Sequence, residues 1–137
     1  MESLIVSANR IDRLILEQIK EELESTGIST ITMTEIIHIS LFAYNWSKNA
    51  FNASFIMEKL TNKLSNFPVS MIIVLFSPTM EYNGYYPECI KRDNIVLFSL
   101  GNIRKRYDGL NFIDEVRDRI LDYTKKRRCL LQFSIVL

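Results

Sequence analysis

The stretch Val69–Ser77 (VSMIIVLFS) constrains the fold most, because nearly every residue in it is apolar. A strand with one face in water alternates polar and apolar residues, whereas a strand covered on both faces does not. The stretch Asn94–Leu100 (NIVLFSL) has the same character. Two such strands predict a sheet that is covered by helices on both sides.

Helical patterns lie between the expected strands. Apolar residues recur at helical spacing from Asn9 to Gly27, over Asn52–Asn66, and in a third helix that begins at Asn111. The residues expected to face inward are Ile11, Leu14, Ile15, Ile19, Leu23, Ile56, Leu60, Leu64, Ile113, Val116 and Ile120. Further strands are expected at Ser3–Ser7, Ile28–Met33 and Leu130–Leu137, and Thr34–Asn49 fits either a strand or a helix.

Strands that alternate with helices favour parallel pairing through right-handed crossovers. We therefore expect one α/β domain over residues 1–137, built as a three-layer, doubly wound, mainly parallel sheet of about five strands.

Several classes of function lack their residues here. One histidine, His38, and two cysteines, Cys89 and Cys129, cannot form a zinc motif of the usual kind. The four glycines form neither a dinucleotide-binding fingerprint nor a P-loop, and we expect no metal and no cofactor. The N-terminus does not resemble a signal peptide, and no apolar run is long enough to span a membrane. A reduced, cytoplasmic protein is the expectation.

A site is expected where the parallel strands end, because open α/β sheets bind ligands beyond the carboxyl ends of their strands. These ends carry Ser7 and Asn9, then Glu35, then Ser77. A long loop, Pro78–Asp93, begins at the last of them and carries Tyr85 and Glu88. Long loops between core strands often carry function, although its aromatic residues would also serve to cover the sheet.

These residues resemble a known family. Ser7, Asp12 and the helix that ends in Glu21–Ile28 (EELESTGI) are similar to the opening of Toll/interleukin-1 receptor (TIR) domains. The stretch Val74–Pro78 (VLFSP) is similar to a later strand of that family. The expected order of strands and helices also fits that family's flavodoxin-like sheet.

The resemblance implies an NAD-cleaving or self-associating signalling module. Glu88 would then be the catalytic carboxylate that stabilises an oxocarbenium-like state. The ligand would contact Ser7, Asn9, Glu35, Ser77 and Tyr85. TIR-like domains assemble through their own surfaces, so the resemblance also implies a homo-oligomer. A simpler explanation of Ser7 and Asn9 is that they cap the following helix. A simpler explanation of Glu88 is that it is an ordinary loop carboxylate in contact with water.

An alternative function rests on charge. Residues 91–137 carry a net charge of +5, against −4 for residues 1–90. The basic residues gather on both sides of the third helix, at Arg104, Lys105, Arg106, Lys125, Lys126, Arg127 and Arg128. Such a face suits nucleic-acid or protein binding without catalysis. Interspersed acidic residues also make it consistent with an ordinary salt-bridged, solvated helix.

Overall fold

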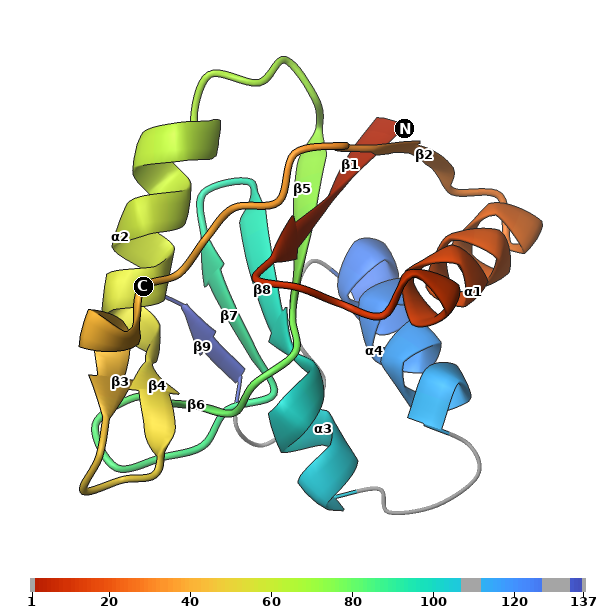
Figure 1. The fold of residues 1–137 in the computed structure, drawn as a ribbon. Coiled ribbons are helices and arrows are strands. Elements are labelled where there is room, and N and C mark those ends of the chain that lie inside the picture. Colours follow the sequence, from red (N-terminus) through yellow and green to blue (C-terminus); the bar gives the residue numbers. More distant parts are fainter. Residues whose placement is uncertain (1, 107–111, 127–133, 137) are drawn as a thin grey trace.

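The computed structural model describes residues 2–106, 112–126 and 134–136, and Figure 1 shows its arrangement. Its helices are α1 (Arg13–Ser25), α2 (Ala53–Leu64), α3 (Leu100–Arg106) and α4 (Phe112–Lys126), with a 3₁₀ turn at Leu41–Ala43. Its strands are β1 (Glu2–Ala8), β2 (Ser29–Thr32), β3 (Tyr44–Asn45), β4 (Ala50–Asn52), β5 (Met71–Phe76), β6 (Met80–Glu81), β7 (Cys89–Arg92), β8 (Ile95–Ser99) and β9 (Ser134–Val136).

The main sheet confirms the α/β prediction. Its strand order is β2-β1-β5-β8-β7-β9, and the first four strands are mutually parallel. That part has the flavodoxin-like order in which the second strand lies outside the first. The pattern then changes, because β7 pairs antiparallel with β8 and β9 pairs parallel with β7. The sheet has six strands, one more than the approximate number expected.

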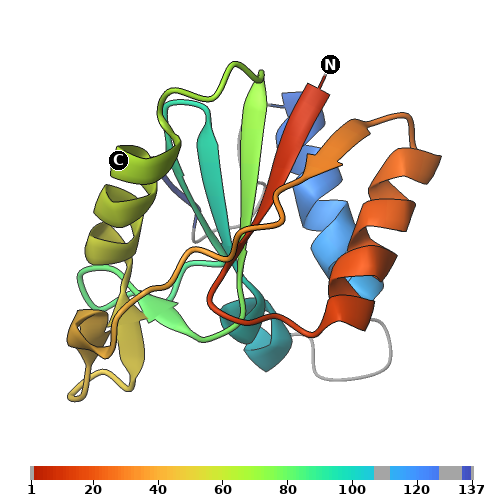
Figure 2. The same cartoon turned by 45° about the horizontal axis from the view of Figure 1, so that its top comes forward.

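Helices cover both faces of this sheet, which explains why β5 and β8 are buried along their whole length. Figures 1 and 2 show α2 on one side and α1 with α4 on the other. Side chains of β1 alternate between the two cores: Leu4 and Val6 pack in the core on the α2 side, and Ile5 packs with α1 and α4. These two cores hold the three layers together.

The carboxyl end of the sheet carries a second, smaller sheet of β3, β4 and β6. Asn102 in α3 fixes the neighbouring backbone, because its side-chain nitrogen donates to the carbonyls of Met80 and Pro87, each at 2.7 Å. Gly101 makes this approach possible. A Cβ atom there would lie 2.7 Å from the backbone of Pro78 and Thr79.

Some element boundaries differ from the sequence prediction. The first helix begins at Arg13 and not at Asn9, because Asn9 has a left-handed backbone (φ 59°) and Asp12 is the N-cap. Residues 101–106 belong to α3, where a polar connection was expected. The segment 78–93 contains β6 and β7, so it is not simply a loop.

The ambiguous stretch Thr34–Asn49 is neither the expected strand nor a helix along its length, since it contains one bridge at Ile37, the 3₁₀ turn and β3. Residues 107–111, 127–133 and 137, on which parts of the predicted connection, third helix and last strand fell, lie outside the described residues. Cys89 is buried and disulfide-bonded, whereas a reduced thiol was expected. None of the described helices is long and apolar enough to cross a membrane.

Candidate functional site

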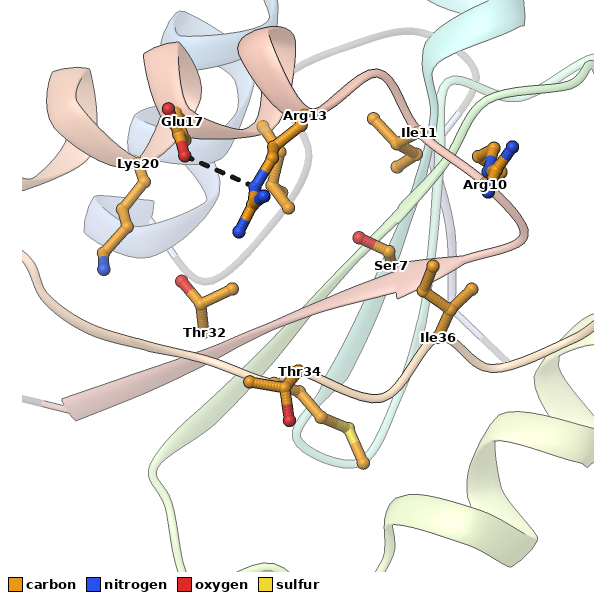
Figure 3. A pocket seen from close by; sticks show the side chains of 11 residues that line it. Ser7, Arg10, Ile11, Arg13, Glu17, Lys20, Thr32, Thr34 and Ile36 are labelled. Carbon is orange, nitrogen blue, oxygen red and sulfur yellow. Dashed lines mark ion pairs between the residues drawn. The ribbon is translucent and has the colours of Figure 1, made fainter.

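A pocket of about 560 Å³ lies between α1 and the carboxyl ends of β1 and β2 (Figure 3). It occurs at the position that the strand-end rule predicts for an open α/β sheet. Residues from α1, the turn before it, β1, β2 and the segment after β2 line it: Ser7, Arg10, Ile11, Arg13, Leu16, Glu17, Lys20, Thr32, Met33, Thr34 and Ile36.

The backbone around this pocket is fixed by hydrogen bonds between β1 and the segment that follows β2. Met33 N donates to the Ile5 carbonyl at 2.8 Å, and Ile37 N donates to the Ser7 carbonyl at 3.0 Å. Asn9 closes the corner, because its Oδ1 accepts from Ile39 N at 2.7 Å. The floor of the pocket is therefore held in place by regular strand-like pairing.

Hydroxyl groups without partners gather on the face of β1 and β2 that lies under α1. The side-chain oxygens of Ser3, Thr30 and Thr32 are buried and form no hydrogen bond within the described part of the chain. Ser7 lies on the same face of β1, the residue is 6% exposed, and no described residue hydrogen-bonds to its hydroxyl. Figure 3 shows that the Ser7 hydroxyl points into the space beneath the helix.

Three cationic side chains and one carboxylate line the same pocket. Arg13 pairs with Glu17 at 3.7 Å, and both side chains are largely exposed. Lys20 is half-buried, and neither Lys20 nor Arg10 forms an ion pair with any described residue. In Figure 3, Arg13 and Lys20 extend from α1 toward the strands. The pocket consequently has a positive charge that the described residues do not balance.

Of the sequence-predicted ligand contacts, only Ser7 lines this pocket. Asn9 uses its side chain on the backbone, as described above, and Glu35 is exposed on the segment after β2. Ser77 is exposed where β5 ends, and Tyr85 is 59% exposed in a tight turn with Tyr82. The structure therefore does not bring these five residues together.

Glu88 lies elsewhere, just before β7, and is separated from β1 by β5 and β8 in the sheet. Its side chain is fully buried, with Oε2 3.3 Å from Arg119 Nε and Oε1 3.9 Å from an Arg106 nitrogen. Burial raises the pKa of Glu88 above the ordinary value, and the two arginines oppose that rise only in part. The carboxylate thus joins β7 to α3 and α4, and it does not line the pocket under α1.

The basic residues expected to form one face do not all point to solvent. Arg106 donates to the Tyr86 carbonyl at 2.9 Å, and Arg104 stacks on the Phe112 ring at 4.4 Å. Lys105 is exposed, and Lys125 and Lys126 end α4. Arg127 and Arg128 lie outside the described residues.

A second pocket of about 460 Å³ lies between α2 and the segment 38–43. It combines the exposed aromatic side chains Phe42 and Phe55 with His38, Glu58 and Lys59. Its charged groups include both signs. It therefore lacks the unbalanced charge of the pocket under α1.

Sequence reasoning found Ser7 but missed Lys20, Arg10 and Thr32. No motif in the sequence assigned Lys20 a role. Lys20 comes four residues after Leu16 and one after the buried Ile19. That spacing places it beside the inward face of α1, and it was the sequence feature that could have indicated a role in the pocket.

No protein-family model and no curated protein matches this chain. Among solved structures, it is similar to archaemetzincin from Archaeoglobus fulgidus, with 14% identity, 90% of this chain and 73% of that chain covered, and a TM-score of 0.61. It is also similar to archaemetzincin from Methanopyrus kandleri, with 13% identity, 84% of this chain and 64% of that chain covered, and a TM-score of 0.60. A third similar structure is a zinc-dependent peptidase from Methanocorpusculum labreanum, with 12% identity, 90% of this chain and 76% of that chain covered, and a TM-score of 0.56. At these identities the likeness shows the fold alone.

These neighbours correct the functional predictions. The resemblance to TIR domains is wrong, and with it the NAD-cleaving or self-associating module, NAD as a substrate and the expected homo-oligomer. The non-catalytic protein- or nucleic-acid-binding alternative is no better supported. The physical reason lies in the motifs, because an apolar strand ending in Ser-Pro and a capped helix after a strand recur in many parallel α/β sheets.

Proposed function

We propose that this chain is a ligand-binding domain whose site is the pocket between α1 and the carboxyl ends of β1 and β2. The observation that carries the proposal is a pair of hydroxyls in the pocket lining. Thr32 Oγ1 is buried and has no partner among the described residues. The Ser7 hydroxyl also has no described partner and points into the pocket. A buried polar group without a partner costs free energy, so a site that keeps one needs a reason. A ligand that forms a hydrogen bond with these hydroxyls would be such a reason.

Zinc-dependent peptide hydrolysis, the activity printed for one structural neighbour, does not fit the residues of this chain. Catalytic zinc takes three protein ligands, and the usual motif places two histidines on one helix. This chain has a single histidine, His38, which lies outside every described helix. The described residues contain no group of three or more His, Cys, Asp or Glu side chains that would hold a metal.

The proposal is tested by two-dimensional NMR of ¹⁵N-labelled protein with a small panel of aromatic fragments, some neutral and some anionic. We expect saturable shift changes at the amides of Ser7, Thr32 and Lys20 with at least one fragment. A matched set of amides around the second pocket, at Phe42 and Phe55, serves as the comparison. If every fragment leaves the first set unchanged, the pocket is not a ligand site and the proposal fails.

A zinc titration in the same experiment separates the two functions. We expect no stoichiometric binding of zinc, because the described residues offer no set of ligands. Tight binding of one zinc ion per chain would contradict this expectation. The cytoplasmic location expected from the sequence stays a prediction, which fractionation of cells expressing the chain would test.

A further inference from the structure

The further inference names the ligand class, and it rests on the proposed function. We propose that the pocket takes a phosphate monoester, with its phosphate held by Lys20, Arg13 and the Ser7 hydroxyl and its apolar body packed against Ile11 and Ile36.

Charge is the first argument. Lys20 is half-buried beside the strands without an ion pair among the described residues, and Arg10 also has none. Arg13 has only Glu17, at 3.7 Å and in an exposed pair. Such surface pairs contribute little, so a ligand anion competes with Glu17 for Arg13 at small cost. Three cations against one carboxylate favour a ligand with two negative charges over a singly charged one.

Hydroxyl donors are the second argument. Ser7 and Thr32 both line the pocket, and neither hydroxyl has a partner in the described part of the chain. They approach from the strands, while Arg13 and Lys20 approach from α1 on the opposite side (Figure 3). A phosphate has three terminal oxygens that accept from several directions at once. Donors on opposite sides of a pocket therefore suit it better than they suit a planar carboxylate.

The site does not depend on the helix dipole. Asp12 caps α1, with its carboxylate accepting from Leu14 N at 2.8 Å, so the first turn already has an anion of its own. Side chains, and not free amides at the helix end, would have to bind the phosphate. This makes the proposal testable by substituting side chains one at a time.

The apolar lining gives the rest of the ligand. Ile11 and Ile36 lie on either side of Ser7 in Figure 3, and Leu16 and Met33 complete the apolar lining. A purely inorganic anion would leave these surfaces in contact with water. Burial of apolar ligand area against them is favourable, which is why we infer an ester and not free phosphate.

The test is isothermal titration calorimetry of the whole chain with phenyl phosphate, inorganic phosphate and benzyl alcohol. We expect one phenyl phosphate per chain, with affinity that falls as salt rises from 0.05 to 0.5 M because the attraction is screened. Inorganic phosphate should bind more weakly. Benzyl alcohol, which keeps the ring and lacks the charge, should bind least.

Variants then assign the residues. Lys20→Met should weaken phenyl phosphate binding about ten- to hundredfold, the range expected for one charge-assisted contact. Lys63→Met, an exposed position on α2 outside both pockets, is the matched control and should leave affinity unchanged. Urea unfolding of both variants confirms that each is folded, so a loss of binding is not a loss of structure.

Three outcomes overturn the inference. Equal affinity for benzyl alcohol and phenyl phosphate would refute the phosphate while leaving a ligand pocket in place. Phenyl phosphate binding that survives both Lys20→Met and Ser7→Ala would place the anion elsewhere. If no compound binds and no fragment shifts the pocket amides, the proposed function fails together with the inference.

Discussion

Replacing Ser7 by alanine should leave the protein at least as stable as the wild type, although the side chain is almost fully buried. The residue Ser7 is 6% exposed, and its hydroxyl forms no hydrogen bond with a described residue. An unpaired buried hydroxyl costs about 1–3 kcal/mol, and water entering the pocket recovers part of that. We therefore expect Ser7→Ala to change the free energy of unfolding by between about 0 and +1 kcal/mol.

The matched control is Ser99→Ala. Ser99 is also buried, but its hydroxyl donates to the Pro78 carbonyl at 2.9 Å and accepts from Asn102 N at 3.0 Å. Removing it leaves two buried groups unpaired, so we expect a loss of about 2–3 kcal/mol. Urea unfolding measures both, and a loss of that size lowers the midpoint by about 1 M for a typical slope. If Ser7→Ala is as damaging as Ser99→Ala, then Ser7 has a structural partner and the argument for the pocket is refuted.

Three further predictions concern the framework. Gly101→Ala should cost about 1–3 kcal/mol in urea unfolding, because the new Cβ would lie 2.7 Å from backbone atoms of Pro78 and Thr79, and an unchanged midpoint would contradict that contact. Asn102→Ala should cost about 3 kcal/mol, since the carbonyls of Met80 and Pro87 lose their donor, and a loss under about 1 kcal/mol would count against it. Burial raises the pKa of Glu88 above its ordinary value of 4.5, so the folded state binds the Glu88 proton more tightly than the unfolded state does. Glu88 therefore contributes stability at low pH, and this contribution is lost as the pH rises through the raised pKa. The stability of the wild type relative to Glu88→Gln should therefore decrease as pH increases from about 4.5, and an increase would mean that Arg119 and Arg106 outweigh burial.

Periodicity predicts much of the fold. The apolar spacing of α1 and α2 and the two-faced runs of β5 and β8 locate the three layers, because those patterns report directly which faces are buried. The boundaries are less secure. Both Asn9 and Asp12 are good N-cap residues, and only the left-handed backbone of Asn9, fixed by tertiary hydrogen bonds to Ile37 and Ile39, decides between them.

Among the elements that the sequence did not predict, α3 and β7 were missed for tertiary reasons. Gly101 made residues 101–106 look like a connection, whereas it is needed for the close approach of α3 to Pro78. The antiparallel strand β7 lies in a segment whose Gly84 and Pro87 correctly disfavour a helix, but its pairing with β8 depends on the turn at Asp93, which has a positive φ.

The candidate site was only partly predictable. The rule about strand ends predicts its location and Ser7, because the rule concerns topology. It does not find Lys20 or Thr32, since their importance comes from lacking partners, and partners are a property of the folded chain. The resemblance to TIR domains made Glu88 the candidate catalytic carboxylate, yet the structure buries it between Arg119 and Arg106.

The most direct test of the account is a crystal structure of the chain grown with phenyl phosphate. We expect the phosphate in the pocket under α1, with one oxygen within about 2.7–3.2 Å of the Ser7 hydroxyl and others at that distance from Lys20 and Arg13. The ring should lie against Ile11 and Ile36. Phosphate density at another surface, with the pocket under α1 holding only water, would contradict the central claim.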